Sequence, residues 1–183
     1  MKFDHTTIID KYYPADTPVR GILLRHSRSV ADMALSILVR KPELGLSPEE
    51  TEAAAMLHDI GIFLTDAPGI YCHGKEPYLM HGVLGADLLR AEGAPEKYAR
   101  VAERHTGAGI TADDVRRLGL PMPVDRVLMP ESALEQLVCY ADCFYSKSGD
   151  MARKDLSRVR EGMARFGPEI LRRFDALHHR FGS

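Results

Sequence analysis

Ionisable side chains interrupt the apolar faces of several predicted helices, and this feature constrains the fold of the sequence most. The apolar stripe that follows Thr17-Pro18 contains a histidine and runs Ile22, His26, Val30, Met33, Ile37. The stripe that follows Glu131 contains an aspartate and runs Leu134, Val138, Asp142, Tyr145. Because an unpaired buried carboxylate is costly, the fold has to place a cation or a metal beside it.

The spacing of apolar residues predicts an all-α chain. Ser47-Pro48-Glu49-Glu50 is a helix start signal, and Gly61 is the expected stop of that helix. Further helices are expected over residues 81–93, 95–106, 111–119 and 131–145, and two more over 151–181 with a break at Gly167-Pro168. Residues 62–80 contain two prolines and two glycines without a clear period, which predicts a long loop that acts as a lid.

The length and charge of the chain indicate one ordinary globular domain. Its 183 residues carry 24 Lys and Arg against 26 Asp and Glu, a formal net charge of −2, and 45% are hydrophobic. This balance predicts no nucleic-acid partner and no anionic-membrane partner. No apolar run approaches the ~20 residues of a membrane span, and the N-terminus lacks a signal-type stretch, so a cytoplasmic protein is expected.

We expect a single domain over residues 1–183, with a core over about residues 20–150 and C-terminal helices over 150–181 packed on it. The C-terminal part from Met151 to Phe181 is basic, with eight Lys and Arg against four Asp and Glu. Packing on the core is the favoured interpretation of these helices. A dimer contact or a surface for anionic partners is the alternative.

Four histidines and two aspartates together predict a metal site at the centre of the helical bundle: His26, His58, Asp59, His81, His105 and Asp142. A single histidine on an apolar face is more often a hydrogen-bonded core residue, so the joint pattern carries the argument. Imidazole suits Zn, Fe, Cu and Ni, and a carboxylate adds oxygen ligands that bridge two ions. A nitrogen and oxygen set without thiolate argues against a structural zinc site.

The order of these residues resembles that of the HD-domain, HDIG-type, metal-dependent phosphohydrolase superfamily. The segment AAAMLHDIGIF matches the HDIG signature of that superfamily. The segments HGVLGADLLR, ERHTGAGIT and CYADCFYSK resemble its small stand-alone proteins with extra histidines. The resemblance covers about residues 20–150 and implies an all-α HD domain.

The resemblance also implies a ligand set. A first metal would be held by His26, His58, Asp59 and Asp142, and a second by His81 and His105, with Asp59 bridging the two. It implies two divalent ions, with iron favoured and Mn, Ni, Zn and Mg left open.

The function expected at this stage is a metal-dependent phosphohydrolase acting on a small phosphorylated metabolite or nucleotide. A metal-bound hydroxide would attack phosphorus, and cations would neutralise the phosphate. Asp59, Arg104 and Lys147 are the expected catalytic residues, ahead of Arg28 and Lys75.

Two alternatives stay open, a mixed-valent di-iron oxygenase and a non-catalytic nucleotide-binding HD module. Ile62 stands where several dimetal relatives carry a lysine, which argues against a cyclic-dinucleotide phosphodiesterase.

Overall fold

The computed structural model describes residues 3–182. Within that range the regular secondary structure is helical apart from one small hairpin. The helices are α1 (His5–Tyr12), α2 (Pro18–Arg40), α3 (Pro48–Leu57), α4 (His81–Ala91), α5 (Glu96–Arg104), α6 (Ala112–Leu118), α7 (Ala133–Asp142), α8 (Leu156–Ala164) and α9 (Pro168–Phe181). The strands are β1 (Asp66–Ala67) and β2 (Cys72–His73), which pair antiparallel. The predicted all-α class is therefore confirmed.

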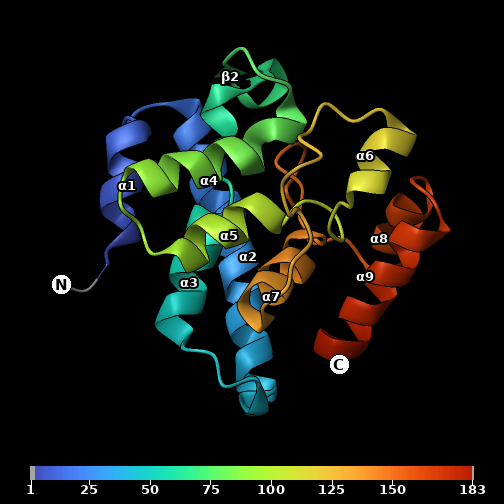
Figure 1. The fold of residues 1–183 in the computed structure, drawn as a ribbon. Coiled ribbons are helices and arrows are strands. Elements are labelled where there is room, and N and C mark those ends of the chain that lie inside the picture. The colour runs from blue at the N-terminus through green and yellow to red at the C-terminus, as the bar shows by residue number, and fades with distance from the viewer. Residues whose placement is uncertain (1–2, 183) are drawn as a thin grey trace.

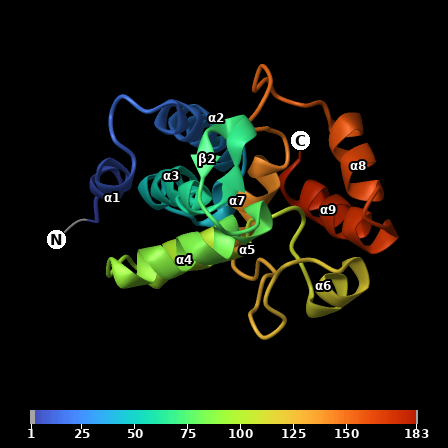
Figure 2. The ribbon, with the colours of Figure 1, turned by 90° about the horizontal axis from the view of Figure 1, so that it is seen from above.

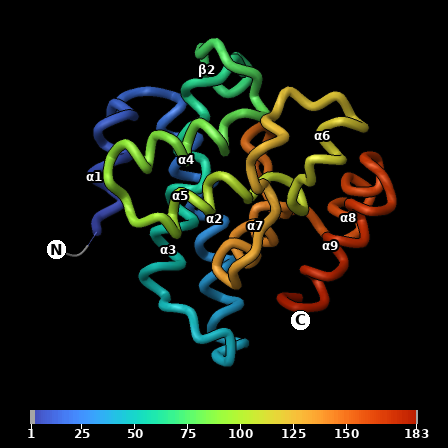
Figure 3. Tube along the Cα trace, in the orientation of Figure 1, coloured from blue at the N-terminus to red at the C-terminus, as the bar shows by residue number. Residues whose placement is uncertain are grey.

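Helices α2, α3, α5 and α7 pack against one another and form the core of the bundle. Helix α4 lies across α5, and α1 covers α3 at the N-terminal side (Figure 1). Helices α6, α8 and α9 lie together on the side away from α1, as both ribbon views show (Figures 1 and 2). The Cα trace places α1 and α9 on opposite sides of the molecule (Figure 3).

Helix α9 packs on α7 through an aromatic cluster. Phe174 and Phe181 are fully buried and lie beside the ring of Tyr140. The Tyr140 hydroxyl is 2.8 Å from Nδ1 of His178. Burial of two large rings supplies several kcal/mol toward holding α9 in place, on the order of 1.5–3 kcal/mol per ring.

Gly61 has a different role from the helix stop that the sequence predicts. Helix α3 already ends at Leu57, and Gly61 has a φ of −88°, which any residue adopts. A Cβ at Gly61 would lie 2.3 Å from the carbonyl oxygen of His81 and 2.5 Å from the backbone nitrogen of Gly85. The glycine is needed because the turn after α3 approaches the backbone of α4 that closely.

The expected loop over residues 62–80 is an ordered segment. It contains three short 3₁₀ helices (Ile62–Leu64, Pro68–Ile70 and Tyr78–Met80) and the hairpin β1–β2. The pairs of the hairpin are Asp66 with His73 and Ala67 with Cys72. Strands of two residues are too short for a period to be visible in the sequence.

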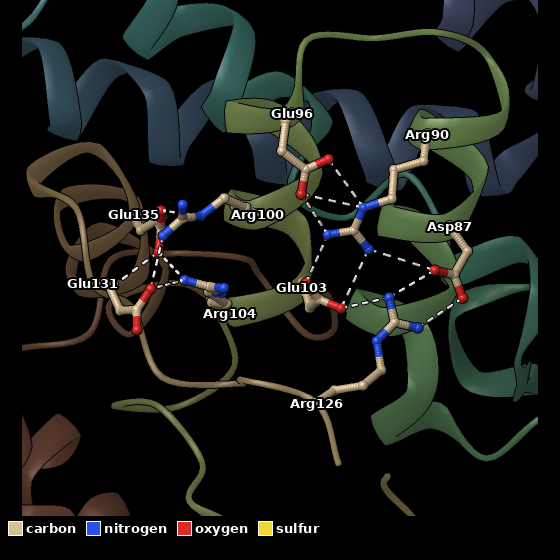
Figure 4. Close-up of polar contacts among 9 residues, drawn as sticks. All are labelled: Asp87, Arg90, Glu96, Arg100, Glu103, Arg104, Arg126, Glu131 and Glu135. Carbon is tan, nitrogen blue, oxygen red and sulfur yellow. Dashed lines mark hydrogen bonds and ion pairs between the residues drawn. The ribbon is translucent and has the colours of Figure 1, made fainter. Parts of the chain in front are cut away.

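Helices α4 and α5 are joined by a network of ion pairs (Figure 4). Arg90 contacts Glu96 at 2.7 Å and Glu103 at 2.9 Å. Arg126, from the loop before α7, contacts Asp87 at 2.7 Å and the same Glu103 at 2.6 Å. Because Glu103 is buried, these two guanidinium groups are the partners that keep its charge from destabilising the core.

Among residues 3–182, no helix is long and apolar enough to cross a membrane.

Candidate metal centre

The six predicted ligand residues lie together, at positions that five helices fix. His26 lies within α2, His81 is the first residue of α4, and Asp142 is the last residue of α7. The other three follow helix ends: His58 and Asp59 come directly after α3, and His105 directly after α5. The four histidines and Asp59 are buried, and the Asp142 side chain is 15% exposed.

One half of the cluster surrounds oxygen Oδ2 of Asp59. Nε2 of His26 and Nε2 of His58 each lie 3.2 Å from this oxygen. Oδ1 of Asp142 lies 2.9 Å from Nε2 of His26 and 3.4 Å from Nε2 of His58. The two imidazole nitrogens are 3.3 Å apart, so four donor atoms converge on one small volume.

The other half surrounds oxygen Oδ1 of Asp59. Nε2 of His81 and Nε2 of His105 each lie 3.4 Å from this oxygen and 3.0 Å from each other. Asp59 therefore presents one oxygen to each pair of histidines, and it is the residue that the two halves share.

Three of the histidine rings are oriented by a backbone carbonyl three residues earlier. Nδ1 of His58 donates to the oxygen of Ala55 at 2.5 Å, and Nδ1 of His105 donates to that of Ala102 at 2.7 Å. Nδ1 of His81 donates to the oxygen of Tyr78 at 2.6 Å. Since a carbonyl only accepts, Nδ1 carries a proton in each ring, and Nε2 is the nitrogen that faces the cluster, as in metal-ligating histidines.

The charge of the cluster is set by two carboxylates, His58 and Lys147. Burial alone would raise the pKa of Asp59, but His58 and Lys147 outweigh it and hold that pKa well below its usual range. The pKa of Asp142 is lowered in the same way, against its burial, by Lys147 and by hydrogen bonds from His26 and His58. Both carboxylates are thus charged, and without a metal the charges of His58 and Lys147 balance them.

Two histidine pKa values show the opposing effects of burial and charge. Burial lowers the pKa of His58, but the charges of Asp59 and Asp142 outweigh it and raise the pKa to about 10. Burial dominates at His81, whose pKa falls to about 3 despite the charge of Asp59. His81 is therefore a neutral imidazole with a free lone pair at neutral pH, the form that binds a metal.

These residues fit a divalent metal. Both oxygens of Asp59 are fully buried without an aligned hydrogen bond, which leaves a carboxylate that an ion would satisfy. Three overlapping groups of donors have their ligand atoms within 4.8 Å of one another: His26–His58–Asp59, His58–His105–Asp142 and Asp59–His81–His105. The cluster and its donor chemistry indicate divalent metal binding.

The structure separates the two cations that the sequence places in the site. Nζ of Lys147 lies 2.8 Å from Oδ2 of Asp59. The lysine also lines an open pocket of about 450 Å³ between residues 62–80, which we call the hairpin segment, and the residues that follow α7. Arg104 points the other way, to Glu131 at 2.6 Å and Glu135 at 3.0 Å (Figure 4). Arg104 precedes His105 and points about 100° away from it around the helix axis, toward the two glutamates, so it does not reach the cluster.

The weaker candidates lie outside the cluster. Arg28 contacts Glu52 at 2.6 Å, and Lys75 and His73 are exposed on the hairpin segment. Sequence reasoning missed the aromatic group of the site, Tyr78. Its ring stacks on His81 with centroids 4.7 Å apart, and Nζ of Lys147 lies 5.8 Å from its centroid.

Comparisons with known proteins identify relatives along most of the chain. The HD domain family model matches residues 23–146. A tRNA (cytidine(56)-2'-O)-methyltransferase of Thermoplasma volcanium is 34% identical over 159 residues, which are 87% of this chain and 41% of that protein. A protein of the same name from Picrophilus torridus is 31% identical over 121 residues, 66% of this chain and 30% of that protein.

An uncharacterised protein of Methanocaldococcus jannaschii is 37% identical over 122 residues, 66% of this chain and 64% of that protein. The chain thus spans less than two thirds of the length of each of these relatives. No solved structure matches the chain.

The names of the relatives correct the predicted function. The phosphohydrolase activity, and the assignment as a hydrolase of phosphoric esters or anhydrides, are contradicted by two relatives named as methyltransferases. The ligand pattern misled the sequence argument because a His and Asp cluster defines a metal site and not the reaction at it. The family itself is shown by the match over residues 23–146 and by the buried cluster: the chain belongs to the HD domain family.

Proposed function

We propose that this chain is a metal-binding HD domain that serves tRNA modification and holds two divalent cations between six side chains. The observation that supports the metal part best is the Asp59 carboxylate. It is fully buried, and its two oxygens face different histidine pairs at 3.2–3.4 Å. A carboxylate with this surrounding is suited to bridge two ions.

In this proposal the first ion is held by His26, His58 and Asp142, the second by His81 and His105, and both by Asp59. Iron is the favoured metal, since imidazole and carboxylate donors without thiolate suit it, with Mn, Ni, Zn and Mg as competitors. Bound ions act as Lewis acids toward an oxygen ligand. Lys147 lies beside the same carboxylate and at the pocket, so it would contact an anionic group of the ligand.

The tRNA part of the proposal is supported by the names of two relatives. The chain spans 41% and 30% of those proteins, so most of their length lies outside the match. We assign methyl transfer to that outside part, and metal binding and tRNA contact to the part that this chain represents. The net charge of −2 predicts no nucleic-acid partner, and the tRNA part of the proposal departs from that prediction.

The metal part is tested by titrating Co²⁺ into variants and measuring stoichiometry by calorimetry. Asp59→Asn should abolish binding of both ions, because it removes the shared charge. The double variant H81A/H105A should retain one ion. His179→Ala, an exposed histidine on α9, is the matched control and should bind like the parent protein. Unchanged stoichiometry in Asp59→Asn would show that the cluster is not the metal site.

The tRNA part is tested by the mobility of a tRNA transcript on native gels with increasing protein. The proposal predicts a retarded complex, and no transfer of labelled methyl groups from S-adenosylmethionine by this chain alone. A tRNA that stays free at high protein concentration would contradict tRNA contact. Methyl transfer by the chain alone would contradict the assignment of that reaction to the outside part.

A further inference from the structure

A groove lies between α6 and α8 and reaches the start of α9, and we call it the α6–α8 groove. It has a volume of about 720 Å³, the size of a ligand pocket. One wall is formed by residues 106–110 and α6, and the other by residues 154–170. The first wall lies within the residues that the family model matches, 23–146, and the second wall lies outside them, so the groove forms where the C-terminal helices meet the HD domain.

Three cations line the groove without a partner. The side chains of Lys154, Arg158 and Arg165 make no hydrogen bond or ion pair with any part of the chain that the structure describes. Arg158 and Arg165 are exposed, and Lys154 is half-buried, with its pKa lowered by burial. Groups that lack an internal partner are available to a ligand.

One of the three acidic residues of the groove, Asp114, is neutralised within the protein. Asp114 contacts Arg117 at 3.0 Å and Arg173 at 2.5 Å. Asp155 caps α8 by accepting from the backbone N–H of Arg158 at 2.8 Å. Glu161 is the remaining carboxylate of the lining. With Asp114 paired, Lys154, Arg158 and Arg165 outnumber the carboxylates of Asp155 and Glu161, so the lining has a small positive excess.

The positive lining continues beyond the groove. A neighbouring cavity of about 410 Å³ shares Lys154 and Asp155 with it and adds Arg40 and Arg153. Arg153 lies over the ring of Phe144, 5.3 Å from its centroid, and Arg40 donates to the hydroxyl of Ser36. Neither makes an ion pair within residues 3–182. Cations spread over two adjoining cavities suit a ligand that carries several phosphates better than a ligand with a single negative group.

An exposed aromatic side chain completes the groove. Phe166, at the turn between α8 and α9, is 54% exposed and lines the groove near Arg165. Its backbone carbonyl accepts from Arg117, which fixes the turn to α6. Exposed aromatic rings beside a cationic groove are the elements with which proteins bind single-stranded nucleic acid, because each base stacks on a ring.

We infer that the α6–α8 groove binds a single-stranded segment of RNA. Phosphates contact Lys154, Arg158 and Arg165, and a base stacks on Phe166. The inference rests on the tRNA part of the proposed function and deepens it, since it names the surface and the part of the RNA that this surface takes.

The test measures fluorescence anisotropy of a labelled single-stranded RNA of about ten nucleotides over a range of salt. The triple variant K154Q/R158Q/R165Q should bind at least about tenfold more weakly and flatten the salt slope by about two. Phe166→Ala should weaken binding about five- to a hundredfold, and should leave the salt slope unchanged. Because all four side chains are exposed or half-buried, the variants should fold, which Co²⁺ binding checks.

The control K11Q/R28Q/K97Q removes the same number of cations from positions that do not line the groove, each ion-paired with a glutamate, and should bind RNA as the parent does. Equal weakening by the control and by the groove variant would overturn the groove while leaving tRNA contact intact. A parent protein that binds tRNA but not the single strand would also overturn it. Displacement of the RNA by millimolar AMP would show a site for free nucleotides instead, and failure to bind any RNA would remove the tRNA proposal as well.

Discussion

Asp59 follows α3 in a turn that two neighbouring contacts hold in place. The hydroxyl of Tyr13 donates to the carbonyl of Ile60 at 2.8 Å, and Gly61 lies against the backbone of α4. The side-chain types of the cluster could be predicted at this scale, because a buried aspartate needs partners. The direction of Arg104 could not, since neighbouring side chains at a helix end point about 100° apart around the axis, and the packing decides which of them faces the cluster.

Replacement of Arg104 tests the structural role that its contacts give it. Arg104→Met should lower the free energy of unfolding by about 2–3 kcal/mol, because Glu135 would lose one of its buried partners, and should leave metal affinity unchanged. Urea unfolding and Co²⁺ titration measure the two quantities. Arg100 contacts the same two glutamates but is half-exposed, so Arg100→Met should lower the free energy of unfolding by less. Lost metal binding with full stability would place Arg104 at the site after all.

Addition of one methyl group at Gly61 tests the close approach to α4. Gly61→Ala should destabilise the protein by about 1–3 kcal/mol, because the new Cβ would overlap backbone atoms that have little room to move. Gly21→Ala in α2 is the control: its Cβ would meet nothing within 4 Å, and alanine should stabilise the helix by about 0.5–1 kcal/mol. Equal urea midpoints for the two variants would refute the packing argument.

The elements differ in how well the sequence predicts them. Helices α2, α4 and α7 carry regular apolar stripes, so their existence and inward faces follow from the period. Helix α1 was not predicted, although Asp4 caps it and Ile8 and Ile9 are buried, because eight residues give too few turns for a clear stripe. The hairpin segment depends on pairing between residues 65–67 and 72–76, which no local pattern reveals.

An ion pair between Asp114 of α6 and Arg173 of α9 links the two helices. Because this ion pair needs a charged Asp114, we expect the stability of the protein to depend on pH. Burial opposes ionisation of Asp114, but hydrogen bonds from Thr111 and the charges of Arg117 and Arg173 lower its pKa to about 2. Since the folded pKa lies below the unfolded value of 3.8, the stabilisation is present above pH 4 and is lost as the pH falls toward 2. Its size is about 2 kcal/mol.

Asp114→Asn should therefore unfold more easily at pH 6, and its stability should fall less than that of the parent between pH 4 and pH 2. Urea midpoints across this range measure the difference. Parallel curves for the two proteins would contradict the role of the Asp114 charge. Other buried carboxylates titrate in both proteins, so the difference between the curves isolates Asp114.

At the scale of the whole molecule, the cluster joins five helices that are far apart in the sequence: α2, α3, α4, α5 and α7. A bound ion contacts the folded state only, since the unfolded chain does not bring these residues together. The sequence could predict which residues meet, because their joint pattern and their order along the chain resemble those of the HD-domain superfamily. It could not predict the reaction, which the residues of the cluster do not determine.

Metal should accordingly raise the melting temperature of the protein. Metal at about 100 times its dissociation constant adds about 2.7 kcal/mol, which corresponds to about 5–10 °C for a chain of this size. Differential scanning fluorimetry with Mn²⁺ or Co²⁺ measures the shift, and Asp59→Asn should show none. An equal shift in the variant would mean that the ion stabilises the fold from another place.

The proposal that the His and Asp cluster holds two ions is tested by the metal content per chain. The protein would be purified untagged and without chelators, and its metals measured by inductively coupled plasma mass spectrometry. Six ligand side chains that share Asp59 should hold about two divalent ions per chain, with iron the major metal. A protein that carries no metal, even after incubation with Fe, Mn, Ni and Zn, would contradict the proposal.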